Sequence, residues 1–306
     1  MASTLQSDLG KIAILGAGKL GASLGLALLA RGQSVVGAYR RNQSALLPIE
    51  MAAFGEAQTL VDAANTVFMC VPDDAIASVC AAIGWRNNHT VIHCSGATEL
   101  AALASAQAQG AKVAGFHPLR SFTVMPTDSD SSLLLFKGIS IGIESTDSET
   151  LRKLEQLCAA LGANSLRIPT GQRALYHASA NYAGAFIPAV LQEAVLQWQH
   201  MGLSQTQALA ALLPLLRSTV LACEKAAAAP NLDQIQPQAQ SLLAQATVGP
   251  IARGDVGTVA RHLAALGECG ANVRLYCELS AAVLPLAKAR GLDSLAAEQI
   301  AQLLKP

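Results

Sequence analysis

Three glycines near the start of the chain have the spacing that binds the pyrophosphate of a dinucleotide. An apolar run ending at Leu15 leads into Gly16, Gly18 and Gly21, and an apolar helical segment follows. In this pattern the first glycine permits a tight turn, the second lets the backbone approach the phosphates, and the third lets the helix pack on the strand. The pattern alone is weak evidence, but the flanking strands and helix supply the context that it needs. We therefore predict a cofactor site that includes Gly16, Gly18, Lys19, Leu20 and Gly21.

Two arginines follow the second predicted strand, where NAD sites and NADP sites differ. An NAD site has an acidic residue about 20 residues after the glycines, whereas a nearby arginine accommodates the 2′-phosphate of NADP. This chain has Tyr39, Arg40 and Arg41 there and no acid. Forked guanidinium donors suit a phosphate, so we predict NADP(H) as the cofactor, although solvated loop charges are the alternative. Val71 and Pro72, at the end of another predicted strand, complete the predicted cofactor site.

A helix that begins near Thr170 carries the first candidates for proton transfer. A nicotinamide cofactor gives or takes a hydride, so the protein must manage a proton on the substrate. His177 and Asn181 are four residues apart, about 40° around a helix with roughly 100° per residue, and they share one face with Gly184 and Pro188. We predict that His177 and Asn181 are catalytic. The alternative is that His177 is a packing or surface residue of the helix.

Polar residues at the ends of two predicted strands form a second set of candidates. His117 follows one strand and can act as an acid, a base or a hydrogen-bond donor, while Arg120 can hold a carboxylate or phosphate. Ser95 and Gly96 follow the preceding strand. Because ligands bind outside the carboxyl ends of parallel strands, we predict a catalytic role for His117 and substrate contacts for the other three. Pro118 leaves open that these side chains are only parts of a rigid loop.

A turn late in the chain supplies one more candidate. Arg253 and Asp255 are separated by Gly254 and follow Gly249 and Pro250. The two charges are either a structural pair, or Arg253 binds an acidic group of the substrate.

The elements that must position these residues alternate between strand and helix in the first half of the chain. Strand patterns occur at 11–15, 34–38, 66–71, 90–94, 112–116, 137–144 and 164–168. Alternation of this kind predicts an α/β fold with a doubly wound parallel sheet. The polar segment 121–132 between two of these strands is predicted as a loop, either a lid or an ordinary surface loop. From Thr170 the patterns are helical, with a capping box at 204–207, so we divide the chain into a Rossmann domain, residues 1–169, and an all-α domain, residues 170–306.

The composition favours a small-molecule partner. The 306 residues contain 21 Lys plus Arg and 21 Asp plus Glu, so no net field attracts nucleic acid or an acidic membrane surface. Charges interrupt the richest apolar stretches, and we predict no membrane span and no secretory signal. Seven scattered cysteines without a Cys-x-x-Cys pair suit a reducing cytoplasm. We also predict no metal, because His89, His93 and Cys94 alternate between the faces of a strand.

Six segments together resemble predicted NADP-dependent oxidoreductases in which a Rossmann-like domain precedes a helical domain of unknown function. The matching segments are residues 16–21, 71–76, 93–97, 116–122, 177–181 and 249–255. More distantly the chain is similar to the β-hydroxyacid dehydrogenases and their ketopantoate, pyrroline-5-carboxylate and prephenate relatives. The resemblance implies a helical domain like that of 6-phosphogluconate dehydrogenase, which commonly dimerises, and hence a homodimer.

The resemblance also assigns roles to individual positions. The dehydrogenases have Lys and Asn one turn apart where this chain has His177 and Asn181. The change from Lys to His keeps a proton donor but a weaker base. Ser95 and Gly96 match a site for the substrate carboxylate. His117 with Pro118 is similar to the catalytic His-Pro of prephenate dehydrogenases, which leaves an oxidative decarboxylation open.

Three hypotheses follow from these observations. The first is an NADP(H)-dependent oxidoreductase acting on a small carbonyl, imine or hydroxy acid at the domain interface. The second is a non-catalytic NADP(H)-binding sensor or assembly protein, which the change from Lys to His at residue 177 permits. The third is a deazaflavin-linked NADP reductase, because related Rossmann proteins use that partner. Fold and cofactor are shared by many reactions, so the substrate does not follow from them.

Overall fold

The structure is a computed structural model that describes residues 9–41, 51–228 and 242–305. Contacts divide the chain into two compact units, Met1–Ala185 and Phe186–Pro306. The division falls later than the predicted boundary at residue 169, because helix α7 (Arg173–Ala183) packs on the sheet of the first unit. The histidine of the predicted catalytic helix and the sheet edge are therefore parts of one unit.

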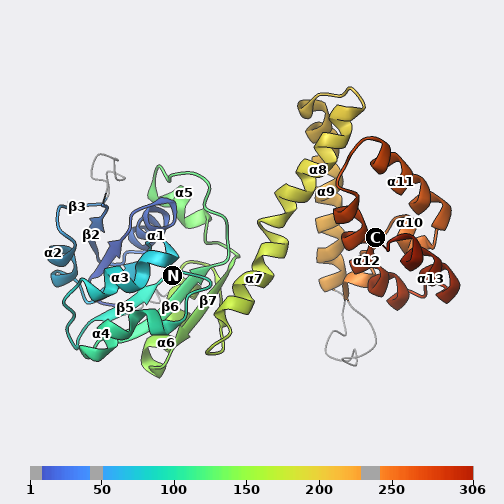
Figure 1. The fold of residues 1–306 in the computed structure, drawn as a ribbon. Coiled ribbons are helices and arrows are strands. Elements are labelled where there is room, and N and C mark those ends of the chain that lie inside the picture. Colours follow the sequence, from blue (N-terminus) through green and yellow to red (C-terminus); the bar gives the residue numbers. More distant parts are fainter. Residues whose placement is uncertain (1–8, 42–50, 229–241, 306) are drawn as a thin grey trace. The chain divides into compact units, whose positions relative to one another are not determined.

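An eight-stranded sheet in the order β3-β2-β1-β4-β5-β6-β7-β8 forms the centre of the first unit (Figure 1). Its strands are β1 (Ile12–Leu15), β2 (Val35–Tyr39), β3 (Ala53–Phe54), β4 (Thr66–Met69), β5 (Thr90–His93), β6 (Lys112–Pro118), β7 (Ser140–Ser145) and β8 (Asn164–Arg167). All seven predicted strands are present, and the two-residue β3 is added at one edge. The predicted α/β class is confirmed.

The sheet is mostly parallel, but β6 and β7 run antiparallel, with His117 opposite Gly142 and Gly115 opposite Glu144. The prediction of a wholly parallel sheet therefore needs this correction. The connection leaves the carboxyl end of β6 and enters β7 at the same end of the sheet, so the chain does not cross to the opposite end between them. Antiparallel strands at the side of a parallel sheet are common in doubly wound folds. The start of β7 consequently lies beside the carboxyl end of β6.

Helices cover both faces of the sheet because alternate residues of each strand face opposite sides. Ile12 and Ile14 of β1 pack with α1 in one core, and Ala13 and Leu15 pack with α2 in the other. The first core is covered by α1 (Lys19–Ala30), α5 (Ser129–Leu134) and α6 (Ser148–Ala160). The second is covered by α2 (Ala57–Asp62), α3 (Ile76–Ala81), α4 (Ala104–Ala108) and the 3-10 turn η2 (Leu100–Leu103), and a further 3-10 turn, η1 (Asp73–Ala75), precedes α3.

Part of the segment predicted as a polar loop is helical. Helix α5 begins after Asp128, whose carboxylate accepts a hydrogen bond from the backbone N–H of Ser131. The helix packs against α1, and Phe136 behind it is fully buried in the core. These contacts anchor the end of the segment, so only its part before residue 129 fits the predicted loop.

The described residues of the second unit are helical. They form α8 (Phe186–His200), α9 (Gln205–Ala227), the turn η4 (Leu242–Ala244), α10 (Pro250–Arg253), α11 (Val256–Glu268), α12 (Val273–Ala289) and α13 (Ser294–Leu303). Ser204 and Gln207 form the predicted capping box at the start of α9. A small core joins Ile251, Val259, Leu284, Ile300 and Leu304. The all-α prediction for this part of the chain is confirmed.

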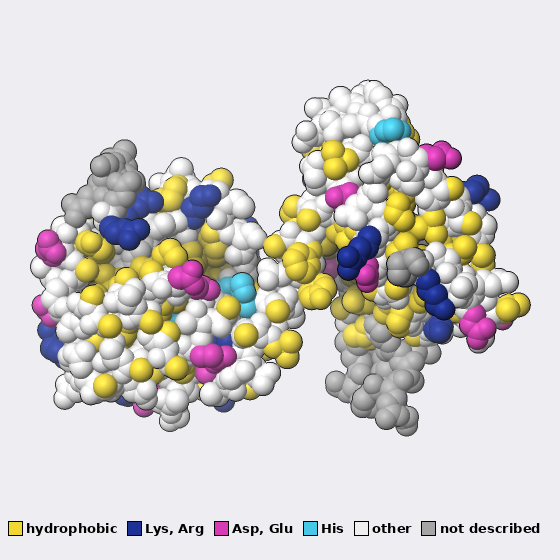
Figure 2. All heavy atoms as spheres, in the orientation of Figure 1, with side chains coloured by type: hydrophobic (Ala, Val, Ile, Leu, Met, Phe, Trp, Pro, Cys, Tyr) yellow, Lys and Arg dark blue, Asp and Glu magenta, His cyan; other side chains and the backbone are white. Residues whose placement is uncertain are grey.

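Helix α9 stands out within the second unit because most of its apolar surface is uncovered. Its 23 residues are long and apolar enough to cross a membrane by length and composition, and only 6% of its most apolar window is buried. Figure 2 shows many hydrophobic side chains at the surface of this unit. Pro214 lies within the helix, and Arg217, Glu224 and Lys225 are charged.

Candidate active site

A cavity of about 780 Å³ lies at the carboxyl ends of β1, β2 and β4. All the predicted cofactor residues except Gly21 line it, namely Gly16, Gly18, Lys19, Leu20, Tyr39, Arg40, Arg41, Val71 and Pro72. A cavity of this size is ordinary for a cofactor or ligand of several hundred daltons. The structure thus brings together residues that are more than fifty positions apart in the sequence.

The three glycines of the loop have the geometry that the pattern predicts. Gly16 has a φ of +95°, and a side chain there would lie 2.6 Å from the carbonyl oxygen of Cys70. A side chain at Gly21 would overlap the carbonyl oxygen of Gly16, which accounts for its packing role outside the cavity. A side chain at Gly18, by contrast, would meet nothing within 4 Å. The space before Gly18 is therefore open for a ligand that approaches the backbone.

The start of α1 fits an anion. Gly18 is the N-cap, no side chain caps the helix, and its first turn has no acidic residue. Unsatisfied N–H groups and the helix dipole favour a phosphate at such a position. Arg40 and Arg41 line the same cavity at the end of β2, so the residues present fit the pyrophosphate and the 2′-phosphate of NADP(H).

The opposite wall of the cavity was not predicted. Glu56 and Gln58 from the start of α2, and apolar residues from η1 and α3, complete the lining. Gln58 is held by hydrogen bonds to Asp62 and to the backbone of Gly84. Short elements such as α2 have too little periodicity to be recognised in the sequence, which is why this wall was missed.

A second group of side chains meets where β5, β6 and β7 approach α7. His117, from β6, has its Nδ1 atom 2.9 Å from the hydroxyl oxygen of Tyr176. The rings of His117 and His177 are in edge-to-face contact, with centroids 5.7 Å apart. A side chain at Gly96 would overlap His177 and lie 2.9 Å from Nε2 of His117. The structure therefore brings His117, His177 and Gly96 together, as the predicted site requires.

His117 is neutral at physiological pH. Burial, followed by the charges of His177 and Arg173, lowers the pKa of His117 to about 4. Asp73, the residue after Pro72 of the cofactor cavity, acts weakly in the opposite direction. Burial raises the pKa of the Tyr176 hydroxyl, so this group keeps its proton. A protonated hydroxyl therefore faces a neutral imidazole.

Arg173 anchors the first turn of α7 to the sheet. Its side chain is fully buried, donates from Nε to Glu144 at 2.7 Å, and donates from Nη1 to the carbonyl oxygen of Ser95 at 2.8 Å. The guanidinium lies on Gly115, where a side chain would overlap it. Glu99 accepts hydrogen bonds from the backbone N–H groups of Gly171 and Arg173. The helix is thus held by two carboxylates and one carbonyl.

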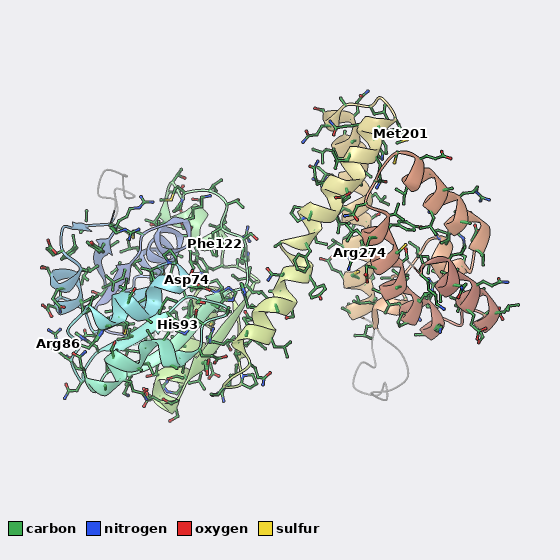
Figure 3. The ribbon with its side chains drawn as sticks, in the orientation of Figure 1. Asp74, Arg86, His93, Phe122, Met201 and Arg274 are labelled. Carbon is green, nitrogen blue, oxygen red and sulfur yellow. The ribbon has the colours of Figure 1, made fainter. Side chains whose placement is uncertain are left out.

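Neither Arg173 nor Glu144 was predicted, although the sequence contains a signal. Glu144 follows the buried Ile141 and Ile143 near the end of a strand, and a carboxylate that is buried there requires a partner. His93 was assigned no role either. It is fully buried at the end of β5 (Figure 3), and burial together with the charges of Arg173 and His117 lowers its pKa to about 3. His93 is therefore a buried histidine that stays neutral at physiological pH.

The remaining predicted residues lie in different settings. The hydroxyl of Ser95 accepts hydrogen bonds from the backbone N–H groups of Ala97 and Thr98 and donates to the Thr98 side chain. Arg120 is exposed after β6. Asn181 is half-buried one turn beyond His177 on α7. Arg253 is exposed at the end of α10 in the second unit, and Asp255 caps α11 through Thr258. Their roles in substrate binding or catalysis stay predictions.

The fold and the cavity define a Rossmann-type nicotinamide-binding protein, and two family matches make this more specific. Residues 11–96 match the family described as NADP oxidoreductase, coenzyme F420-dependent. Residues 139–283 match a domain of unknown function, DUF2520. The chain thus combines an NADP oxidoreductase domain with a DUF2520 domain, which confirms the resemblance inferred from the motifs and NADP(H) as the cofactor. No curated protein is significantly similar to the chain in sequence.

Solved structures with the same fold cover nearly all of the chain. An inferred NADP oxidoreductase from Bacteroides fragilis has a TM-score of 0.68 at 20% identity, over 91% of this chain and 99% of that one. A reductive aminase from Aspergillus terreus, in complex with NADPH and ethyl levulinate, has a TM-score of 0.60 at 17% identity, over 95% and 98%. Pyrroline carboxylate reductase from Plasmodium falciparum, with NADP bound, has a TM-score of 0.56 at 14% identity, over 97% and 98%. At these identities the likeness shows the fold.

Proposed function

We propose that the chain is an NADP(H)-dependent oxidoreductase that reduces a small carbonyl or imine, or oxidises the corresponding alcohol or amine. The observation that supports this most is the contact of His117 and His177 over Gly96, at the same sheet edge as the glycine loop. The family of the first domain and the titles of the reductive aminase and pyrroline carboxylate reductase support this class. NADP(H), when bound, supplies or accepts the hydride.

His117 is proposed to bind the heteroatom of the substrate through Nε2. The hydroxyl of Tyr176 keeps its proton and is 2.9 Å from Nδ1, so it can donate to that nitrogen. In neutral imidazole one nitrogen is then an acceptor and the other carries the hydrogen. We propose that the Tyr176 hydroxyl is the donor, which selects the tautomer with the hydrogen on Nε2, beside Gly96, where it donates to a carbonyl oxygen. On this proposal Tyr176 is a positioning residue.

His177 is proposed to transfer the proton that balances the hydride. In the direction of reduction, carbon gains the hydride while oxygen or nitrogen gains a proton. His177 contacts the His117 ring and stands where the related dehydrogenases have a lysine. Asn181, one turn further along the half-buried face of α7, is proposed to orient the substrate. Arg120, exposed after β6 in the same unit, is proposed to hold an acidic group of it.

The test is consumption of NADPH with a panel of ketones, keto acids and imines, and of NADP with hydroxy acids. His177→Ala should lower kcat about 100-fold or more because it removes the proposed general acid, and His117→Ala should lower kcat by about as much because it removes the hydrogen bond to the substrate heteroatom. NADPH affinity should be nearly unchanged in both variants. His262→Ala is the matched control, since His262 makes the same 2.9 Å contact with Tyr276 in the second unit. NADPH binding without turnover of any substrate would favour a non-catalytic sensor instead.

A deazaflavin-linked NADP reductase is the second candidate, because the name of the first matched family includes coenzyme F420. In that case hydride would pass between the nicotinamide and the deazaflavin. Mixing the protein with NADPH and the oxidised deazaflavin should then bleach the deazaflavin absorbance. The same experiment with the His177→Ala variant shows whether that residue takes part.

We also propose that the protein is a homodimer. The second unit exposes large apolar side chains on α8 and α9, among them Leu196, Leu215 and Leu221 at 50–62% exposure. Exposed apolar patches of this kind mark interfaces, and the resemblance implies dimerisation. A second copy would cover α9 without a membrane. Mass measurement in solution tests this, and Leu215→Glu with Leu221→Glu should yield monomers.

A further inference from the structure

Two cysteines directly follow neighbouring strands, and one of them lines the cofactor cavity. Met69 of β4 and His93 of β5 are register partners, so Cys70 and Cys94 are the next pair along the two strands. Their Sγ atoms are 3.4 Å apart. Among the described residues no other two cysteine sulfurs are within hydrogen-bond distance of each other, and all seven cysteines are free thiols.

The backbone at this position already has the spacing of a disulfide. Neighbouring strands lie about 4.8 Å apart, and disulfides join Cα atoms about 4.4–6.8 Å apart. The two sulfurs must approach by roughly 1.4 Å to reach a bond length of about 2.05 Å. Rotation about the two Cα–Cβ bonds would supply part of this change, and a small shift of the two strand ends would supply the rest.

The two thiols differ in access. Cys70 is half-buried and lines the cavity, whereas Cys94 is only 5% exposed. The hydrogen bond with Cys70, together with burial, raises the pKa of the Cys94 thiol well above its ordinary value. Cys94 therefore keeps its proton in the reduced pair. An oxidant that enters the cavity meets Cys70 first.

We propose that Cys70 and Cys94 are a reversible oxidation site that responds to a hydroperoxide and weakens cofactor binding. The Cys70 thiolate attacks the terminal oxygen of the peroxide, the O–O bond breaks, and Cys70 becomes a sulfenic acid as hydroxide or alkoxide leaves. The sulfur of Cys94 then attacks the Cys70 sulfur, loses its proton and displaces hydroxide, which leaves as water. Two thiols and one hydroperoxide thus give one disulfide, one water, and a second water or an alcohol. A dithiol returns the pair to the reduced state.

Coupling to the cofactor follows from what Cys70 touches. Its backbone carbonyl lies where a side chain on Gly16 would be, and its Cβ is 3.0 Å from where a side chain on Gly21 would be. The backbone N–H of Cys70 also donates to the carbonyl oxygen of Leu15, just before the glycine loop. Movement of Cys70 toward Cys94 is therefore transmitted to the loop that faces the pyrophosphate. By linkage, bound NADPH should shift the equilibrium between disulfide and dithiol toward the dithiol.

The experiment treats the full-length protein without cofactor with hydrogen peroxide and then measures intact mass and peptide masses. The expected result is loss of two hydrogens, a Cys70–Cys94 linked peptide, and reversal by dithiothreitol. Cys94→Ser should instead accumulate oxygen on Cys70, and Cys70→Ser should form no such peptide. Cys80→Ser is the matched control, because Cys80 is a buried cysteine that accepts a hydrogen bond from Ser105 and, among the described residues, has no second cysteine beside it. This variant should behave like the native chain.

NADPH titration of the oxidised and reduced protein completes the test. Oxidation should weaken NADPH binding about fivefold or more, the lower end of ordinary coupling between sites, and Cys94→Ser should not acquire this disulfide-dependent change. Absence of the linked peptide in the native chain would overturn the oxidation site. Formation of the peptide with unchanged NADPH affinity would overturn the coupling. Because mass reports the disulfide without turnover, failure of the proposed enzymatic function would be seen separately.

Discussion

Glycines near the carboxyl ends of the strands leave space for a ligand at one place, Gly18, and for helix α7 at a second set of three. At Gly18 a side chain would meet nothing within 4 Å, so the space belongs to a ligand. At Gly96, Gly115 and Gly142 a side chain would collide with His177, Arg173 and the Tyr176 hydroxyl, respectively, all from α7. Gly18 opens onto the cofactor cavity. The second set forms the surface on which a helix with histidine and tyrosine can lie close to the strands.

The difference teaches that a glycine in a sequence does not say what fills its space. The Gly-x-Gly-x-x-Gly pattern is recognisable because its three positions are local. Gly115 lies in β6, Gly142 in β7 and Gly96 in the turn after β5, and all three are matched to residues of one helix. Their common purpose is visible only when the strands and the helix are brought together.

The largest expected effect is that of Gly115→Ala. The added methyl group would displace the guanidinium of Arg173 and leave Glu144 buried without its partner. Breaking a buried ion pair costs about 3–5 kcal/mol, and urea unfolding measures this loss. Gly267→Ala, in an open position of α11, should be neutral or stabilising by up to about 1 kcal/mol. A native-like stability for Gly115→Ala would show that Arg173 is not fixed by this contact.

The free energy of unfolding should also fall as the pH is lowered, because two buried histidines near Arg173 are neutral in the folded chain. His93 and His117 have pKa values of about 3 and about 4 in the folded chain, against 6.5 when unfolded. The unfolded state therefore binds more protons below pH 6.5, and stability is lost as the pH falls from 6.5 toward 4 and 3.

Unfolding free energy measured between pH 7 and pH 4 tests this, with His93→Gln and His117→Gln each expected to flatten the dependence. His200→Gln, an exposed histidine at the end of α8, is the control and should leave the slope unchanged. An unaltered slope in both buried-histidine variants would contradict the predicted neutral state.

Gly18→Ala should distinguish most sharply a glycine that serves the cofactor cavity from one that serves packing of α7. Its φ of −76° suits an alanine, so the fold should remain stable, but the methyl group occupies the space before the backbone. We expect NADPH affinity to fall about tenfold or more, equivalent to about 1.4 kcal/mol, in a fluorescence titration.

Gly96→Ala provides the converse measurement. Its methyl group should move His177 and His117 and lower turnover while NADPH affinity stays near the native value. Equal losses of affinity in Gly18→Ala and Gly96→Ala would mean that the two sets act on one site.

The smallest expected effect is that of replacing Arg40 and Arg41 together with alanine. The ratio of NADPH affinity to NADH affinity should fall about tenfold, because the 2′-phosphate loses charge-assisted donors. Parallel titrations with both nucleotides measure it. Arg31→Ala, at the exposed end of α1, should leave the preference unchanged.

Much of the fold could be predicted because its signals are local. Apolar runs such as that of β1 and β4 and the capping box at Ser204 need only neighbouring residues to be recognised. The antiparallel β7 could not be predicted in this way, since its amino-acid pattern is the same in either direction. Strand β3, with only two residues, has no measurable alternation.

The candidate site was predictable in its chemistry but not in its support. His117 and His177 were proposed from strand-end and helix-face positions, and the structure brings their rings together. Arg173 and Tyr176 were missed because their partners lie more than 28 positions away in the sequence. For Ser95 the strand-end position predicted a substrate contact, and the local turn also uses its hydroxyl as a hydrogen-bond acceptor for Ala97 and Thr98.

The antiparallel pairing of β6 and β7 also limits where segments of related proteins can be joined. The DUF2520 match begins at residue 139, one residue before β7, so it contains the last two strands of the sheet as well as helices. A chain ended at residue 138 would expose the hydrogen-bonding edge of β6, a template for aggregation. Chimeras between relatives should therefore be joined near residue 185, where the contacts divide, and not where the two families meet.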